Sequence, residues 1–515
     1  MTETMTSQRP NVLLITSDQQ HHSTLGSVNP RIKTPALDRL ANEGVRFDRA
    51  YCPNPTCTPT RATIITGMMP SQHGAWSLGT KLLEDVPTLG AMLSEAGYRT
   101  SLVGKAHFQP LASTAEYPSI ECQPILRDLD FWRDFTGPWY GFDHVETARM
   151  HGNESHVGQH YAIWMEEKGL TNWADYFQPW PPKDDDGKPY YEKGQLHWDL
   201  PEEYHYTTWT GERTIAQIEE AVADDRPFFT WASFHDPHPP YTVPEPWASM
   251  YDPADMQPGT VTEGEHDANP PHFAEAMKPD AKMREIFPPS DGAIHGGHSQ
   301  AHDYDELKKN MAIYYGMTSF MDHHIGRILD KLDELGIAEN TIVIFTTDHG
   351  HFLGQHGLTA KAIHHYEDLL RIPFLVRWPG GNVPAGGTSE AIQNLVDLAP
   401  TILRAVGLDV PGAMTGVDQR ATWAGGDPAR DWSVTENHHG NEVCHMRSYV
   451  NDRYKITVYR AWDDGELFDL QEDPNELKNL WADPAATELK AKLLLEFMQA
   501  TLQSEPVRMP RIAGA

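Results

Sequence analysis

Residues 11–18 read NVLLITSD, a short apolar run that ends in an aspartate. Apolar runs of this length are typical of strands that are buried on both faces of a parallel sheet. In open α/β sheets, ligands bind beyond the carboxyl ends of such strands. The stretch therefore predicts a central parallel strand over Asn11–Ser17, with Asp18 at a binding edge of the sheet.

Two further stretches repeat this pattern. Residues 341–348, TIVIFTTD, also end in an aspartate, and apolar residues at helical spacing followed by Gly336 predict a helix that leads into this strand. A third run, PFFTWAS at residues 227–233, is followed by His235 and His238. Alternating helices and buried strands are typical of an α/β fold. We expect the two strands that end in aspartate to be neighbours in the sheet.

The pattern of predicted secondary structure changes after Gly412. Before it, residues 396–408 predict one more helix of the main body. After it come patterns typical of antiparallel strands and one amphipathic helix, at residues 447–459, 465–470 and 487–502. We therefore expect a large domain over residues 1–412 and a small α+β domain over residues 413–515.

Two long stretches of the main body, residues 150–205 and 244–303, lack a clear helical or strand pattern. Loops of this length in a compact domain are usually functional lids or disordered segments. The first is rich in Trp and Tyr, which favours an ordered lid.

Composition excludes several classes of partner. The 515 residues carry 73 acidic and 41 basic side chains, a formal net charge of −32. Such a protein repels nucleic acid phosphates and anionic lipid headgroups, so we expect neither nucleic acid nor membrane as a partner. The four cysteines are too few for a disulfide framework, no apolar stretch reaches the roughly 20 residues of a membrane span, and the N-terminus does not resemble a secretory signal. We predict a cytoplasmic protein.

The most specific motif is PTCTPTRATIITG at residues 55–67. Cys57 is followed two positions on by Pro59, which fixes φ, and four positions on by Arg61. If a helix begins near Pro59, the thiol lies at a helix N-terminus, where the helix dipole favours anions and lowers a thiol pKa. On these residues alone, a small buried cysteine in a turn remains the alternative.

This segment resembles the signature of the type I sulfatase family, C-x-P-x-R followed by an apolar pair, Thr and Gly. It matches at every fixed position: Cys57, Pro59, Arg61, Ile64, Ile65, Thr66 and Gly67. Residues 97–107, GYRTSLVGKAH, resemble the second sulfatase signature, with Ala106 where a larger residue is usual. The resemblance extends over about residues 10–110, 205–245, 305–410 and 445–500. It implies the alkaline phosphatase-like α/β fold, a large mixed β-sheet sandwiched by helices with a smaller α+β C-terminal domain.

The resemblance also implies a nucleophile. In this family the cysteine, here Cys57, is oxidised to formylglycine by a formylglycine-generating enzyme, and the hydrate of formylglycine attacks the sulfate ester. Arg61 is implied as the electrostatic anchor of this group, and Lys105 as a ligand of the sulfate. His107 is implied to help break down the covalent intermediate.

Two further positions match residues that contact the sulfate and the leaving-group oxygen in the family. These are His238, in FHDPHPP, and Lys361, which lies 13 positions after Asp348. His238 is implied to protonate the departing alcohol. Acid assistance of this kind contributes on the order of 10²–10⁴-fold to a rate.

Family resemblance places metal ligands at Asp18, Cys57, Asp348 and His349. Carboxylates and an imidazole around one hard cation make chemical sense. Most sulfatases carry a second Asp after the first and an Asn after the later one, whereas this chain has Gln19 and His349. This departure leaves the divalent metal ion open, with calcium as first choice and manganese as second.

The sequence therefore predicts a hydrolase of small sulfate monoesters, either aryl or alkyl sulfates. A phosphonate monoester or phosphodiester hydrolase that uses the same site is the alternative, because an Asp-His pair also occurs in phosphonate monoester hydrolases and choline sulfatases. The Lys-x-His pair at residues 105–107, which phosphonate monoester hydrolases lack, favours sulfate. A non-catalytic oxyanion-binding scaffold with an unmodified cysteine is the alternative of another class. A homo-oligomer, dimer or tetramer, is compatible with the sequence.

Overall fold

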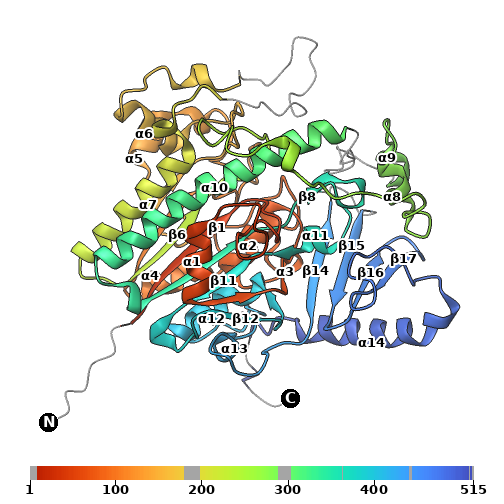
Figure 1. Cartoon of the computed structure of the whole chain (residues 1–515). Helices are drawn as coiled ribbons and strands as arrows, with labels where there is room; N and C mark the ends of the chain where they lie inside the picture. Colours follow the sequence, from red (N-terminus) through yellow and green to blue (C-terminus); the bar gives the residue numbers. More distant parts are fainter. Residues whose placement is uncertain are drawn as a thin grey trace.

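The computed structural model describes residues 9–178, 198–287, 303–361, 363–439, 444–509 and 511–512. Its centre is an eight-stranded mixed sheet with the strand order β12-β2-β11-β7-β1-β6-β4-β5 (Figure 1). The strands are β1 (Asn11–Ser17), β2 (Val45–Phe47), β4 (Arg99–Gly104), β5 (His144–Thr147), β6 (Phe228–Ser233), β7 (Thr341–Thr347), β11 (Phe374–Arg377) and β12 (Gly387–Ser389).

Parallel pairing brings the strand ends to one edge. β1 pairs in parallel with β7 on one side and with β6 on the other, and β6 pairs in parallel with β4. Ser17 lies opposite Thr347, and Thr16 lies opposite Ser233, so these strands end nearly level. The prediction that the two strands ending in aspartate are neighbours is confirmed. β11 is antiparallel to both β7 and β2, which makes the sheet mixed.

Helices cover both faces because successive side chains of a strand point to opposite sides. On β1, Val12 and Leu14 pack into one core cluster with α2 (Cys57–Thr66), α4 (Leu89–Glu95) and α12 (Leu398–Ala405). Leu13 and Ile15 pack into a second cluster with α1 (Pro35–Glu43), α7 (Tyr206–Ala223) and α10 (Tyr304–Glu334). The predicted sandwich of helices around one large sheet is confirmed.

The C-terminal part contains a four-stranded antiparallel sheet with one long helix against it (Figure 1). Its elements are β14 (Ser433–His438), β15 (His445–Val450), β16 (Tyr454–Tyr459), β17 (Gly465–Asp469) and α14 (Thr487–Gln503). Ile456 and Leu467 of the sheet and Leu493 and Phe497 of α14 form their shared core. β15, β16, β17 and α14 match the predicted strands and helix, whereas β14 was not predicted. The boundary between residues 412 and 413 stays a prediction.

Shorter elements connect these layers. A three-stranded sheet joins β10 (Arg371–Ile372), β3 (Ala50–Tyr51) and β13 (Gln393–Asn394), and β8 (Phe352–Leu353) pairs with β9 (Thr359–Ala360). The short helices are α3 (Pro70–His73), α5 (Leu129–Asp134), α6 (Gln159–Glu167), α8 (Pro271–Ala276), α9 (Met283–Ile286), α11 (Glu367–Leu370) and α13 (Arg420–Trp423).

The two stretches expected to be irregular contain three of these helices. In the first, α6 buries its side chains from Gln159 to Met165 in succession and packs in an aromatic cluster with Trp173, Trp198 and Trp209. A helix buried on every side has no alternation of apolar and polar faces, so its period cannot be recognised in the sequence. The described aromatic residues of this cluster thus belong to a packed layer. The helix predicted over residues 396–408 is shorter, because a 3₁₀ turn at Leu395–Asp397 precedes α12.

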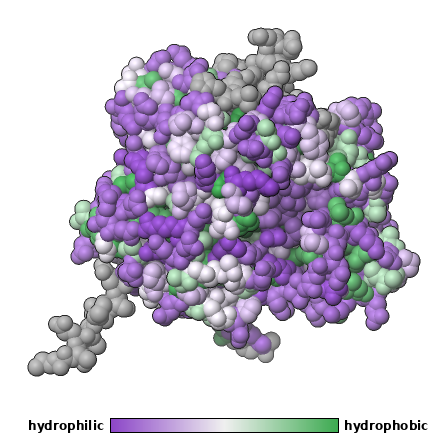
Figure 2. All heavy atoms as spheres, in the orientation of Figure 1, coloured by the Kyte–Doolittle hydropathy of each residue, from purple (hydrophilic) through white to green (hydrophobic). Residues whose placement is uncertain are grey.

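No helix within the described ranges combines the length and the apolar character that a membrane span requires. The face seen in Figure 2 is dominated by hydrophilic side chains, with apolar residues scattered singly or in small groups.

A buried cation joins the C-terminal sheet to the main body. Lys455 on β16 is fully buried; its ammonium contacts the carboxylate of Glu476 and lies 3.4 Å from Oε1 of Glu367 on α11. The other oxygen of Glu367 accepts a hydrogen bond from the hydroxyl of Tyr51 on β3 at 3.0 Å. A buried charge of this kind is tolerated only while its partners are present.

Replacing Lys455 with alanine is expected to lower the free energy of unfolding by about 3–5 kcal/mol, because two buried carboxylates lose their cation. Denaturant unfolding measures this loss. Lys492→Ala is the matched control, since Lys492 forms an exposed ion pair with Glu496 at 3.5 Å on α14, and exposed pairs contribute little. Equal stability of the two variants would contradict this account.

Candidate active site

Four adjacent strands supply the site from their carboxyl ends. Asp348 and His349 follow β7, Asp18 follows β1, His238 follows β6 after a short loop, and Lys105 follows β4. Ligand sites of open α/β sheets lie at this edge. The fold therefore gathers residues that are separated by up to 331 positions in the chain.

Helix α2 brings Cys57 to this edge. The helix begins at Cys57, with Thr56 as N-cap, so the thiol lies in its first turn as predicted. The sulfur of Cys57 lies 3.7 Å from Oδ1 of Asp18, 3.2 Å from Nε2 of His349 and 3.0 Å from Nζ of Lys361. Cys57 is 1 % exposed. Three predicted site residues thus surround the predicted nucleophile.

Arg61 ties the strand ends together. It follows Cys57 by one helical turn and therefore projects from the same side of α2. Its Nε donates to Oδ2 of Asp348 at 2.9 Å, and one terminal nitrogen donates to the backbone carbonyl of Lys105 at 2.9 Å and to Oγ of Ser233 at 2.7 Å. The other terminal nitrogen lies 3.6 Å from Oδ2 of Asp18. One guanidinium thus contacts groups at the ends of all four strands.

Two lysine ammonium groups complete the charge of the site. The ammonium of Lys105 contacts Oδ2 of Asp18, and both side chains are fully buried. The ammonium of Lys361 lies 3.2 Å from Nε2 of His238 and 3.4 Å from Nε2 of His349. Because an ammonium can only donate, Nε2 of His238 accepts, and Nδ1 donates to the carbonyl of Pro239 at 2.5 Å.

The two aspartates are held in their anionic form. Burial favours the neutral acid, but Lys105 and Arg61 outweigh it and hold the pKa of Asp18 well below its usual range. Burial and Asp18 likewise raise the pKa of Asp348, while His349 and Arg61 leave it lowered overall. Two buried carboxylates therefore face a shell of cationic side chains.

These donors fit one divalent cation. Asp18, Cys57, Asp348 and His349 each offer one ligand atom, and all four atoms lie within 4.8 Å of one another. The two carboxylates suit a hard ion, and the imidazole extends the choice to manganese. The structure thus contains a potential metal site at the positions predicted for it.

Two further histidines, His235 and His107, are not among the four candidate metal ligands. His235 lies outside this group, because its Nε2 donates to the carbonyl of Ala148 at 2.9 Å. His107 is 6 % exposed, with a backbone φ of 59°, and its Nδ1 has no hydrogen-bond partner among the described residues. Burial and the nearby cations Arg149 and Lys105 hold the pKa of His107 well below its usual range, so its ring is neutral.

The sequence did not reveal a further histidine of the site. Nε2 of His151 lies 2.7 Å from Nζ of Lys105 and 3.7 Å from Oδ2 of Asp18, and its Nδ1 lies 3.0 Å from Oε2 of Glu154. Both residues belong to the stretch that showed no pattern. The His-x-x-Glu spacing is the one signal that could have drawn attention to them, and it is too short to be specific.

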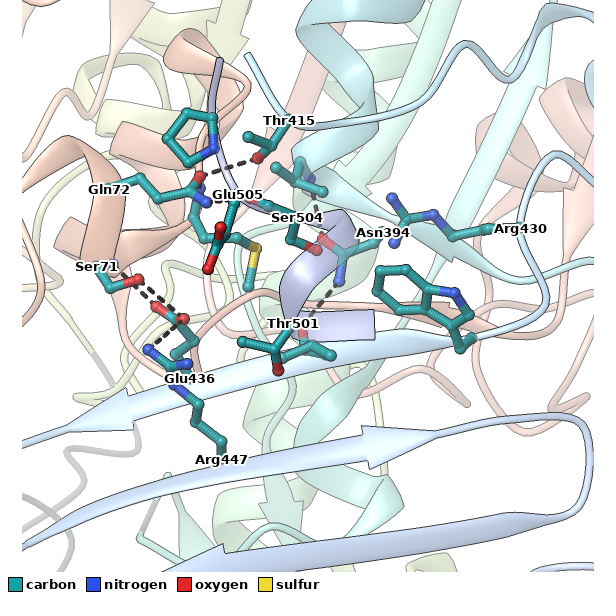
Figure 3. Close-up of a pocket in the computed structure, with 15 residues that line it drawn as sticks. Ser71, Gln72, Asn394, Thr415, Arg430, Glu436, Arg447, Thr501, Ser504 and Glu505 are labelled. Atoms are coloured by element: carbon teal, nitrogen blue, oxygen red, sulfur yellow. Dashed lines mark hydrogen bonds and ion pairs between the residues drawn. The ribbon is translucent and has the colours of Figure 1, made fainter. Parts of the chain in front are cut away.

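A separate cavity of about 230 Å³ lies between the C-terminal sheet, α14 and the segment after α2 (Figure 3). Its two arginines are already paired: Arg430 lies 2.6 Å from Asp397, and Arg447 lies 3.0 Å from Glu436, which also accepts a hydrogen bond from Oγ of Ser71. None of the predicted site residues lines this cavity.

The comparison with known families agrees with the geometry. Residues 10–408 match the model of the sulfatase family, and residues 354–503 match the model described as N-sulphoglucosamine sulphohydrolase, C-terminal. The first match covers well over half of the chain. The chain belongs to the sulfatase family. It is a sulfuric ester hydrolase, and the resemblance seen in its motifs is confirmed.

Similar proteins include sulfatases and relatives from the same superfamily. An arylsulfatase of Clostridium perfringens is 28% identical over 492 residues, which cover 92% of this chain and 90% of that protein. A multifunctional alkaline phosphatase superfamily protein of Trinickia caryophylli is 28% identical over 522 residues, covering 96% and 95%.

A phosphonate monoester hydrolase from Silicibacter pomeroyi shares the fold. Its solved structure superposes with a TM-score of 0.77 at 24% identity and covers 97% of this chain and 96% of its own. The predicted alkaline phosphatase-like architecture is therefore confirmed.

The thiol of unconverted Cys57 provides a test of this electrostatic environment. Burial and Asp18 raise its pKa, but Lys105 and Lys361 outweigh them and lower it to about 7. The test uses unconverted, metal-free protein, and Cys57→Ser identifies the part of the thiolate absorbance that belongs to Cys57. This absorbance should rise with a midpoint near pH 7, rather than near the usual thiol pKa of about 8.5.

Lys361→Met removes one of these cations and should move the midpoint to higher pH. Lys331→Met is a suitable control, because Lys331 lies on the outer part of α10 and pairs with Glu219 and Glu334. A midpoint that both substitutions leave unchanged would show that Lys361 does not act on the thiol.

Proposed function

We propose that this sulfatase hydrolyses small aryl or alkyl sulfate monoesters with a formylglycine derived from Cys57 as nucleophile and one divalent cation. One observation carries the proposal: the predicted nucleophile, two carboxylates and three cationic side chains lie in one buried cluster. These residues are Cys57, Asp18, Asp348, Arg61, Lys105 and Lys361. Such a cluster balances the charge of an oxyanion in a protein whose net charge is −32. The sulfur of Cys57 stands in for the oxygens of the modified residue.

Asp18, Asp348, His349 and the oxygens of the modified residue 57 would hold the cation, with calcium as first choice and manganese as second. When bound, the cation would supply positive charge and Lewis acidity beside the nucleophile. Arg61 keeps the two carboxylates oriented through its contacts with both.

Lys105 and Lys361 neutralise the charge that develops on the sulfuryl oxygens. Both ammonium groups lie in the buried cluster, where preorganised charge acts more strongly than in water. Lys361 lies 3.0 Å from the sulfur of Cys57, which supports this role.

His238 acts as the acid for the departing alcohol. Burial and Lys361 hold the pKa of His238 well below its usual range, so its ring is neutral before substrate binds. An anionic ester beside Lys361 opposes this effect, because a nearby negative charge favours the imidazolium. His238 is thus able to take up a proton together with the substrate and to donate it to the leaving oxygen.

His107 acts as the base that releases the product. After the ester is cleaved, residue 57 carries the sulfate on one of its two oxygens. His107 takes the proton from the other hydroxyl, the carbonyl re-forms, and the bond to sulfate breaks with its electron pair on the sulfate. A neutral ring with an unpartnered, buried Nδ1 suits a base.

The proposal extends to maturation and assembly. A formylglycine-generating enzyme is required to oxidise Cys57, and we place the protein in the cytoplasm as a homodimer or homotetramer. Residues 1–412 form the catalytic domain in this proposal, and residues 413–515 form the smaller one.

The alternative substrate is a phosphonate monoester or a phosphodiester at the same site. Two observations favour it: His349 stands where most sulfatases have an Asn, and the relative from Trinickia caryophylli is named multifunctional. The Lys-x-His pair at residues 105–107 favours sulfate. A non-catalytic scaffold is less consistent with a complete set of nucleophile, acid and cation ligands.

Replacement of Cys57 by alanine is expected to lower turnover of 4-nitrophenyl sulfate by at least about 10³-fold, because the nucleophile is removed. Cys52→Ala is the matched control: Cys52 is equally buried, and its sulfur faces the carbonyl of Leu369 at 3.8 Å. Mass spectrometry of the peptide that contains residue 57, from protein produced in the native host, should show the aldehyde. An unmodified thiol together with undiminished turnover in Cys57→Ala would overturn the proposal.

The choice between sulfate and phosphonate can be measured directly. We expect kcat/KM for 4-nitrophenyl sulfate to exceed that for 4-nitrophenyl phenylphosphonate. Both esters carry one negative charge, but the sulfate has three non-bridging oxygens and the phosphonate two, so the second ammonium, Lys105, has one more oxygen to contact in the sulfate. Substitution Lys105→Ala should lower the value for the sulfate more than that for the phosphonate. A higher kcat/KM for the phosphonate in the unaltered enzyme would favour the alternative.

A further inference from the structure

Two lysine–histidine pairs lie side by side in the site. The rings of His151 and His238 are stacked, with centroids 3.8 Å apart and planes at 16°. Lys361 lies 3.2 Å from Nε2 of His238, and Lys105 lies 2.7 Å from Nε2 of His151. His238 is part of the proposed machinery, whereas His151 has no role in it.

Glu154 determines which nitrogen of His151 carries the proton. Because the ammonium of Lys105 can only donate, Nε2 of His151 accepts, and the ring proton lies on Nδ1. That N–H donates to Oε2 of Glu154 at 3.0 Å, and the same oxygen accepts the backbone N–H of His151 at 3.1 Å. Glu154 therefore fixes both the tautomer and the orientation of the ring.

The loop that carries this pair is packed against the loop of His238. Gly152 has a φ of 46°, and a Cβ there would lie 2.8 Å from Cγ of Pro240. The carbonyl of Asn153 accepts the backbone N–H of Gln178 at 2.8 Å. The close approach and the positive φ explain why position 152 is a glycine.

We propose that Glu154 and His151 form a positioning pair that orients the ammonium of Lys105 toward the substrate, an inference that rests on the proposed function. A lysine side chain is long and flexible, and its ammonium has three donors. Asp18 and His151 take two of them in the described contacts, and the third is the one that we assign to the substrate. Orientation before substrate arrives lowers the reorganisation needed in the transition state.

The same atoms do not form a second metal site. Asp18, His151 and His238 offer ligand atoms within 4.8 Å of one another. However, the ammonium of Lys105 contacts Asp18 and lies 2.7 Å from Nε2 of His151, so it takes the place that a second cation would need. The lysine is the cation that these groups hold.

A double-mutant cycle tests the positioning role. Glu154→Gln keeps the shape of the side chain but weakens its hold on Nδ1, and His151→Ala removes the acceptor for Lys105. Each is expected to lower kcat/KM by about 10–100-fold, mainly through kcat, the range found when orienting partners of a site are removed. In a Lys105→Ala background, the same two substitutions should cost less than about twofold, because they act through the lysine.

Two further variants separate positioning from folding. His151→Gln retains an oxygen that can accept from Lys105, so it should keep more activity than His151→Ala. His144→Ala is the matched control: Nε2 of His144 contacts Oε1 of Glu146 at 2.9 Å in a similar pair away from the cluster, and kcat should not change. Equal penalties with and without Lys105, or no loss in Glu154→Gln, would overturn the positioning role.

The cycle uses whichever ester the unaltered enzyme cleaves, 4-nitrophenyl sulfate or 4-nitrophenyl phenylphosphonate. If the enzyme does not cleave the sulfate, the proposed function is contradicted and the positioning pair is not. If the losses in kcat/KM from Glu154→Gln and His151→Ala simply add to the loss from Lys105→Ala, the positioning pair is contradicted and the proposed function is not. If neither ester is cleaved, the same cycle is measured as binding of inorganic sulfate by calorimetry, where coupling through Lys105 is again expected and its absence would overturn the inference.

Discussion

The whole site depends on one buried guanidinium. Arg61 is fully buried, and its nitrogens contact two carboxylates, a serine hydroxyl and a backbone carbonyl at the ends of four strands. Removal of such a charge from water costs several kcal/mol, which is recovered only when the geometry is good and the donors are satisfied. The arrangement of the strand ends and the position of α2 are thus linked to the same side chain.

The local charge of the site is opposite to that of the protein as a whole. The chain carries a net charge of −32, which repels an anionic ester at long range. Within the buried cluster, Lys105, Lys361 and Arg61 lie close to the nucleophile. Because the local dielectric constant is low, their attraction for a bound anion is stronger than the repulsion from distant surface carboxylates, which solvent and salt screen. Binding of an anion is therefore a property of this edge of the sheet and not of the surface seen in Figure 2.

Two cations of the site, Arg61 and Lys105, contact partners that follow different strands. Asp348 after β7 orients Arg61, while Asp18 after β1 orients Lys105. His151, in the loop after β5, adds a second contact to Lys105 and stacks on His238 from the loop after β6. A site assembled in this way has little freedom to rearrange when the substrate enters, which is what electrostatic catalysis requires.

The sequence by itself determined the strands that end in Asp18 and Asp348, the motif that contains Cys57 and Arg61, and the family, because each is encoded in a short contiguous run. It could not reveal α6, which is buried on all sides, or the role of His151, whose partners Lys105 and His238 lie 46 and 87 positions away. The periodicity of hydrophobic residues and the spacing of motifs carry information only about residues that are close in the sequence. Contacts between loops of different strands exist only after the parallel sheet has brought the strand ends level, so tertiary structure alone decided them.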